Sequence, residues 1–216
     1  MTNITHEVWD FINKYPEIKK NLTNEIINIR ALANFIIKKE NLDASMHSVI
    51  SAIRRYDKEK IKHFENQAGD ILKDSKISTK SRIVSIIMSR EFDFLEEIMP
   101  QIYASIDVSK GELLRIAQGR RAIEIFIDHS KKSDILDIIP DRKIYKITEN
   151  LGEINIHLDE RRGDCLGLVP TITNELALTG INIVEIIGCM PEIIIIVNER
   201  NISKAHDTLL RFFYGD

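Results

Sequence analysis

A glycine in front of a predicted helix is the first place where residue types suggest chemistry in this 216-residue chain. Gly167 stands between a predicted strand and a predicted helix, so a ligand could approach the backbone there, and the helix N-terminus offers unpaired N–H groups to a carboxylate. The α-carboxylate of an amino acid fits this position. Its ammonium needs an acceptor, which Asp159 at the exit of the preceding strand could supply, and Asn182 on the adjacent strand carries both donor and acceptor. The alternative is a structural turn, in which Gly167 serves only chain reversal and Asn182 caps a strand.

A second polar group lies on one side of a predicted helix from Met46 to about Tyr56. A rotation of about 100° per residue places the apolar side chains within one arc and leaves an opposite face without any acid. Arginine pairs with phosphate or with guanine edges in the major groove, and serine can contact either, so this face is a candidate for double-stranded DNA. The alternative is an ordinary solvated helix face. The candidate DNA-contacting residues are His47, Ser48, Ser51, Arg54 and Arg55.

Catalytic chemistry finds little support in the sequence. The six histidines show no metal-ligand spacing, and neither a phosphate-binding loop nor a G-x-S-x-G motif occurs. We therefore expect no enzyme activity, no metal and no cofactor other than an amino-acid effector.

Charge and cysteine content restrict the classes of partner. The net charge is −3, but residues 1–64 carry 11 basic and 8 acidic side chains (+3), whereas residues 151–216 carry 5 and 10 (−5). A basic front and an acidic back indicate different partners for the two ends. Two cysteines without C-x-x-C spacing favour a protein of the reducing cell interior. The sequence shows no signal-like segment and no apolar segment of membrane-spanning length. We expect a cytoplasmic protein without a membrane partner.

The front of the chain reads as helical. Apolar residues at helical spacing predict helices over 5–14, 17–22, about 24–40 and 46–56. A helix, a short turn and an amphipathic helix with a basic outer face form the helix-turn-helix arrangement, and residues 29–56 are similar to winged-helix-type regulator domains.

The last third of the chain reads as strand, helix, strand, strand, helix. The strands are predicted over 153–159, 181–187 and 193–197, and the helices over about 168–177 and 201–213. This is the ferredoxin-like order, which has four strands when complete. All five residues Ile193–Val197 are apolar, so both faces of that strand should be covered, by a neighbouring module or by a second chain. This favours a homodimer.

The segment resembles the ACT domain, a module that senses small molecules in amino-acid biosynthesis. The resemblance is carried by Leu166-Gly167-Leu168, by Thr179–Ile183 and by Ile194–Glu199, although ACT modules usually have Pro-Gly where this chain has Leu166-Gly167. It implies an effector site, usually at an interface between modules, formed by Asp159, Gly167, Leu168, Val169, Asn182 and Ile183.

An earlier copy of the same order precedes it. Strands over 82–89, 112–118, 122–127 and 143–148, with helices over 92–103 and 133–139, give an internal repeat of about 70 residues. Ser89–Phe92 lacks the glycine of the ligand loop, so this copy resembles a degenerate ACT module, and the tandem resembles the regulatory tail of aspartate kinases. The sequence leaves open whether residues 143–148 close the first copy or complete the second.

These patterns predict an α+β protein with an N-terminal helix-turn-helix-like domain (1–64), a linker (65–80) and two ferredoxin-like modules. The resemblance implies that the first of these modules (81–150) is a degenerate ACT module and the second (151–216) an ACT module. The combination resembles an archaeal-type regulator of amino-acid metabolism with an ACT domain. The leading hypothesis is a dimeric transcription regulator that responds to an amino acid. One alternative is a regulatory subunit that controls a biosynthetic enzyme without contacting DNA, and another is a structural dimer with vestigial ACT folds.

Overall fold

A computed structural model describes residues 4–56, 69, 71–90, 94–159 and 167–215. The chain divides into two compact units. We call them the helical unit, Met1–Gly69 with Cys165–Gly167, and the sheet unit, Asp70–Asp164 with Leu168–Asp216.

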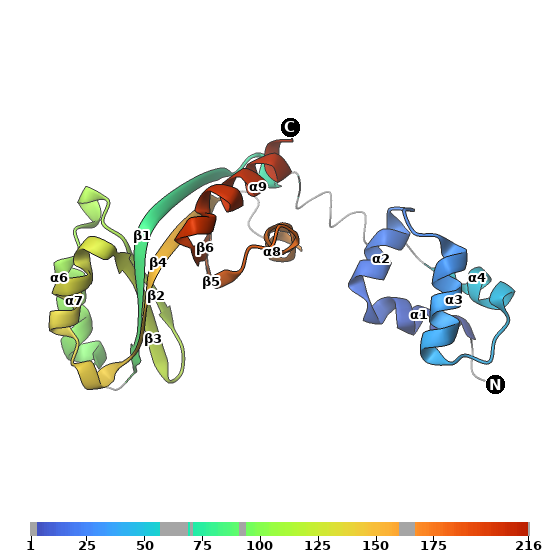
Figure 1. Cartoon of the computed structure of the whole chain (residues 1–216), viewed down its shortest axis with the longest axis horizontal. Helices are drawn as coiled ribbons and strands as arrows, with labels where there is room; N and C mark the ends of the chain where they lie inside the picture. The colour runs from blue at the N-terminus through green and yellow to red at the C-terminus, as the bar shows by residue number, and fades with distance from the viewer. Residues whose placement is uncertain (1–3, 57–68, 70, 91–93, 160–166, 216) are drawn as a thin grey trace. The chain divides into compact units, whose positions relative to one another are not determined.

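The helical unit contains α1 (Ile4–Lys14), α2 (Pro16–Thr23), α3 (Ile29–Glu40) and α4 (Met46–Arg54), shown in blue in Figure 1. Helix α4 packs against α1 and α3. Val49 and Ile53 are fully buried, as their helical spacing predicts, whereas Met46 and Ile50 of the same predicted arc are half-buried. Ala52 is also fully buried, and its carbonyl oxygen accepts a hydrogen bond from Trp9 Nε1 at 2.9 Å. The buried core of the unit consists of Val8, Phe11, Ile12, Leu22, Leu32, Ala33, Ile36, Val49, Ala52, Ile53 and Tyr56.

Side-chain caps set where α3 and α4 begin. Asn28 Oδ1 accepts hydrogen bonds from the backbone N–H groups of Arg30 and Ala31, both at 3.0 Å, so α3 starts at Ile29 and not near residue 24 as its apolar pattern suggests. Ile26, which falls within the predicted helix, precedes α3 and is 72% exposed. Ser45 caps α4 in the same way through the N–H of Ser48.

The sheet unit is built on one six-stranded antiparallel sheet with the order β2-β3-β1-β4-β6-β5. Two strands of 14 residues, β1 (Lys76–Ser89) and β4 (Ile144–His157), run along its centre (Figure 1). The shorter strands are β2 (Leu114–Gln118), β3 (Ala122–Asp128), β5 (Ile183–Cys189) and β6 (Glu192–Asn198). The helices are α6 (Met99–Ser105), α7 (Lys132–Ile138), α8 (Leu168–Leu178) and α9 (Ile202–Tyr214), with a π-helical turn at Phe94–Ile98 ahead of α6.

The two long strands each serve both halves of the sheet. Residues 83–89 of β1 pair with β3, and residues 83–88 pair with residues 144–151 of β4, whereas residues 76–80 pair with residues 153–157 of β4. Residues 144–148 therefore lie in the first half, and the second half obtains its fourth strand from residues 76–80. The strands predicted over 143–148 and 153–159 are parts of one strand, and the one predicted over 82–89 begins six residues earlier, at Lys76.

Each long strand changes direction where it passes between the halves. Arg82 in β1 and Asn150 in β4 have left-handed backbone conformations, with φ of 58° and 56°, and the β1–β4 register shifts on both sides of Ile83. Such irregularities bend a strand and increase its twist. Beyond the bend, Gly152 leaves room for α9, because a Cβ there would lie 1.9 Å from Cδ1 of Ile202.

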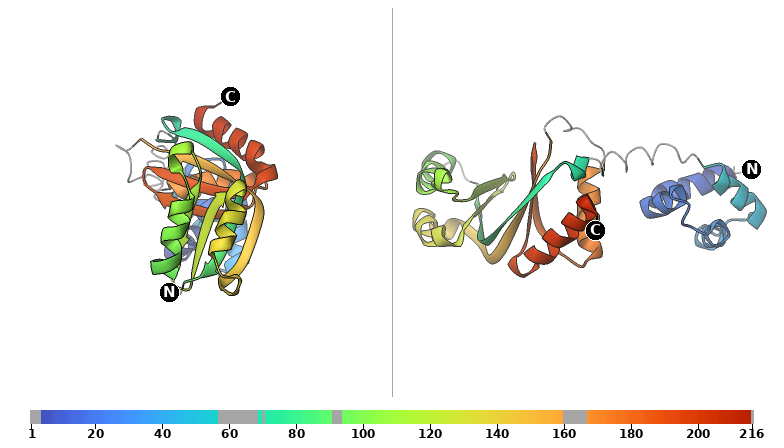
Figure 2. Two further views of the ribbon diagram at one scale, coloured as in Figure 1. Left: turned by 90° about the vertical axis from the view of Figure 1, so that its left-hand side faces the viewer. Right: turned by 90° about the horizontal axis from the view of Figure 1, so that it is seen from above.

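The bend turns the two halves toward each other. Figure 2 (right) shows α6 and α7, in green and yellow, outside one half, and α8 and α9, in orange and red, outside the other. Between the halves lies a buried cluster of Ile83, Leu113, Phe126, Leu151, Ile194 and Ile196. The second face of β6 is thus covered by the neighbouring half of the same chain, so its unbroken apolar run does not call for a second chain.

Candidate functional site

The glycine expected to open the ligand loop has an unusual backbone. Gly167 directly precedes α8 and has a φ of +85°, a conformation that favours glycine. It is exposed, and a Cβ built on it would meet no described atom within 4 Å. The backbone of Gly167 is therefore open to approach within the described residues. Its predecessor in the expected motif, Leu166, lies outside them.

The two residues after Gly167 differ in what they can offer a ligand. Leu168 is 6% exposed, and its side chain belongs to the core beneath α8 together with Ile172 and Leu176. Only the backbone N–H of Leu168 is suited to contact a ligand. Val169 is 43% exposed and could contribute apolar side-chain surface.

Asn182 and Ile183 lie together beside α8. They line an open hollow of about 500 Å³ whose other residues are Pro170, Thr173, Asn174, Ala177 and Ile181. Asn182 is exposed, so its amide is available to a polar group in that hollow. Asp159 is half-buried, lies two residues beyond the end of β4 and does not line this hollow.

The five residues expected to contact DNA all belong to α4 or its C-cap, but their side chains are not equally available. His47 and Arg54 are exposed. Ser48 is half-buried, and its hydroxyl forms a hydrogen bond with that of Ser45 at 2.8 Å. Ser51 is also half-buried. The face that α4 presents is therefore narrower than the sequence suggests.

Arg55 is partly engaged within the helical unit. Its Nη2 donates to Thr5 Oγ1 at 3.1 Å, and its Nε donates to the carbonyl oxygen of Ser51 at 3.4 Å. Arg54 is the better candidate for a phosphate or base contact, because its side chain extends from α4 without a hydrogen bond to the rest of the described unit.

The sequence did not predict the ion pair between Arg115 and Glu153. Arg115 on β2 donates from Nε and Nη2 to the two carboxylate oxygens of Glu153 on β4, at 3.1 and 3.0 Å. The Glu153 side chain is only 5% exposed, and hydrogen bonding to it raises the pKa of Arg115. The sequence does hold a signal, since a glutamate stands between Gly152 and Ile154 in the segment 151–156 of β4, whose other residues are buried or half-buried. Its partner, 38 residues away, is revealed only by the fold.

The described residues contain neither a candidate metal site nor a candidate membrane-spanning helix. No group of three or more His, Cys, Asp or Glu side chains there could hold a metal ion. Among the helices of the same residues, none combines the length and the apolar character needed to span a membrane.

Comparison with known proteins relates the fold to one group of structures. No protein-family model matches the sequence, and no curated protein is significantly similar to it. Similar solved structures include aspartate kinase from Synechocystis (13% identity, TM-score 0.52) and from Clostridium acetobutylicum (16% identity, TM-score 0.51). The matches cover 63% of this chain and 26% and 34% of those enzymes, respectively. The ligand-free regulatory subunit of aspartate kinase from Thermus thermophilus matches over 63% of this chain and 96% of its own, with 10% identity and a TM-score of 0.50.

These similarities concern the fold. Over the matched part, the chain combines helices and antiparallel sheet in the manner of the regulatory subunit of aspartate kinase. It spans only about a third of the clostridial enzyme's length.

Proposed function

We propose that this protein is an amino-acid-responsive regulator whose sheet unit is a pair of ACT modules and whose helical unit binds DNA. The observation that carries the sensor part is the accessible glycine ahead of α8. Gly167 has the left-handed backbone and the open surroundings that a carboxylate needs to approach a helix N-terminus. The likeness of the fold to aspartate kinase regulatory domains supports the same proposal.

In this proposal the α-carboxylate of a free amino acid binds the first N–H groups of α8. Gly167 and Leu168 contribute backbone, and Val169 and Ile183 contribute apolar contact. Asn182 donates to or accepts from the ligand, and Asp159 offers charge to its ammonium. An effector of this kind acts only if it binds one arrangement of the protein more tightly than another.

A ligand screen tests the sensor. Each of the twenty common amino acids is added to the full chain, and the unfolding temperature is measured. A ligand at 100 times its dissociation constant stabilises the protein by about 2.7 kcal/mol, which shifts the midpoint measurably. Asn182→Ala should weaken the effect, whereas Asn34→Ala, the same change at an exposed position of α3, serves as the matched control. Absence of a shift with every amino acid would reject the sensor.

For the helical unit we propose that α3 and α4 form a helix-turn-helix and that a homodimer reads DNA through α4. Support comes from the exposed His47 and Arg54 on a helix that is held by a serine cap and by a buried apolar face. The alternative, a subunit that regulates a biosynthetic enzyme, would use the same helices to contact protein.

Removal of one charge separates these two possibilities. Arg54→Ala should weaken DNA binding and reduce the salt dependence of log K by about one unit, as for a lost phosphate contact. Arg211→Ala removes an equal charge at an exposed position of α9 and should leave binding unchanged. Equal affinity of the Arg54 variant and the unmodified chain for genomic DNA fragments would favour the enzyme-regulating subunit.

A further inference from the structure

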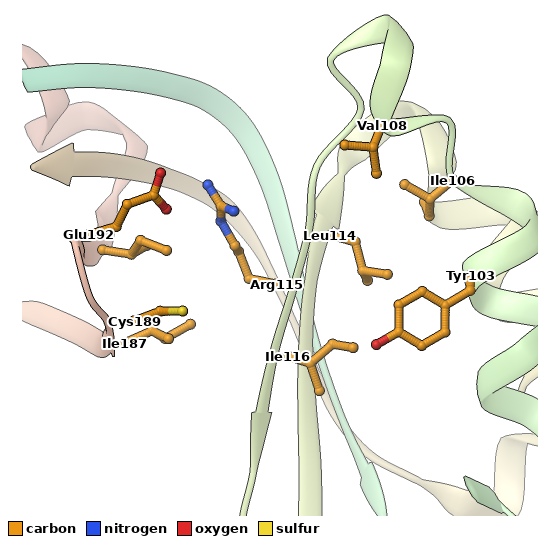
Figure 3. Close-up of a pocket in the computed structure, with 10 residues that line it drawn as sticks. Tyr103, Ile106, Val108, Leu114, Arg115, Ile116, Ile187, Cys189 and Glu192 are labelled. Carbon is orange, nitrogen blue, oxygen red and sulfur yellow. The ribbon is translucent and has the colours of Figure 1, made fainter. Parts of the chain in front are cut away.

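A cavity of about 280 Å³ lies beside the edge strand β2, between the end of α6 and the β5–β6 hairpin (Figure 3). It is separate from the hollow at α8, since the two share no lining residue. Most of its wall is apolar, formed by side chains such as Val108, Leu114, Ile187 and Ile194. Its volume suits a small molecule and is too small for a protein segment of any length.

Two opposite charges face each other in this cavity. Figure 3 shows the Arg115 guanidinium and the Glu192 carboxylate pointing toward one another, with Cys189 nearby. No ion pair joins Arg115 to Glu192 in the described structure, whose ion pair at Arg115 is the one with Glu153. The half-buried carboxylate of Glu192 thus faces a cation without contacting it.

Arg115 is held in place and still has donors to spare. Glu153 occupies its Nε–H and one N–H of Nη2 in a two-pronged contact. A guanidinium has five N–H donors, so three remain, including both on Nη1. A rigid arginine with free donors is well suited to bind a carboxylate.

We propose that the cavity beside β2 is a second ligand site, which takes a free α-amino acid with an apolar side chain. The carboxylate of the ligand accepts hydrogen bonds from the spare N–H groups of Arg115, its ammonium donates to Glu192, and its side chain packs against Ile187 and Ile194. Because β2 belongs to one half of the sheet unit and Glu192 to the other, a bound zwitterion links the two halves. The inference shares the ligand class of the proposed sensor but not its site.

Alkylation of Cys189 measures occupancy of this cavity directly. Cys189 is exposed and lines the cavity, and the chain has two cysteines, so Cys165→Ser leaves Cys189 as the sole thiol. The full chain with this change is treated with N-ethylmaleimide in the presence of L-leucine, L-isoleucine, L-valine or L-phenylalanine. At least one of them should slow the alkylation saturably. Two leucine analogues, 4-methylpentanoate without the ammonium and 3-methylbutylamine without the carboxylate, should not protect at the same concentration.

Matched variants identify the contact. Glu192→Gln should raise the half-protecting concentration about tenfold or more, because it replaces a charge-assisted hydrogen bond by a neutral one. Glu185→Gln removes the same charge from β5, outside the cavity, and should change nothing. Asn182→Ala, at the α8 hollow, should also leave protection intact.

Several results would overturn the inference. They are failure of all four amino acids to protect Cys189, equal protection in the Glu192 variant, or equal protection by 3-methylbutylamine. Loss of protection in Asn182→Ala would assign the effect to the α8 hollow and also overturn it. If an amino acid raises the unfolding temperature but does not protect Cys189, the second site is wrong while the sensor stands.

Discussion

Replacing either partner of the buried ion pair should give unequal losses of stability. The Arg115 side chain is 29% exposed, whereas that of Glu153 is 5% exposed. In Arg115→Met the carboxylate remains buried without its cation, and in Glu153→Gln the guanidinium keeps an amide oxygen nearby and partial access to water. The first variant should therefore lose more free energy of unfolding than the second.

The expected magnitudes follow from the geometry. Removing one partner of a buried pair costs about 3–5 kcal/mol, and the partial exposure of Arg115 favours the lower end, about 3 kcal/mol for Arg115→Met. Glu153→Gln should cost about 1–2 kcal/mol, the range for a hydrogen bond to a charged group. The double variant Arg115→Met/Glu153→Leu should lie within about 1 kcal/mol of the unmodified chain, because apolar replacements remove both desolvated charges.

Urea unfolding followed by circular dichroism at a β-sheet wavelength measures these changes. Trp9 is the only tryptophan of the chain and lies in the helical unit, so its fluorescence provides an internal control. The fluorescence midpoint should stay constant across the variants. A larger loss in Glu153→Gln than in Arg115→Met, or strictly additive losses in the double variant, would refute the assignment of the pair as buried and coupled.

Three further perturbations test other parts of the fold. Gly152→Ala should destabilise the sheet unit by about 1–3 kcal/mol through overpacking against Ile202, and Ile202→Val, which removes Cδ1, should recover part of the loss in urea unfolding. Asn28→Ala should cost the helical unit about 1 kcal/mol, read from the fluorescence midpoint, whereas Asn28→Ser should retain most of the stability. The backbone N–H of Asp107 lowers the pKa of Glu112 below its ordinary value of 4.5, so this carboxylate stabilises the fold above pH 4.5 and ceases to do so as pH falls through the lowered pKa. Glu112→Gln should accordingly flatten the pH dependence of stability below pH 4.5, and an unchanged slope would contradict the contact.

The sequence determined the features that depend on neighbours along the chain. The helical spacing of Val49 and Ile53 identified the buried side of α4, because residues three and four apart share one face of a helix. Gly167 was recognisable as a special backbone position, since glycine is the residue that readily takes a positive φ. The order of strands and helices in the last third also follows from local periodicity.

The periodicity of the sequence could not show that only some of the outer side chains of α4 are accessible. Ser48 and Arg55 fall on the outer face by angle alone, yet one is tied to Ser45 and the other to Thr5 of α1. A helical projection describes one helix and omits the cap before it and the helix beside it.

Only the tertiary structure decided how the two halves of the sheet unit share strands. That residues 76–80 complete the second half, and that β1 and β4 each run through both halves, depends on pairing between segments far apart in the chain. The contact between Arg115 and Glu153 is of the same kind. The alternation of apolar and polar residues along a strand shows which side chains share a face. The partner strand and the register depend on how much apolar surface the assembled sheet can bury.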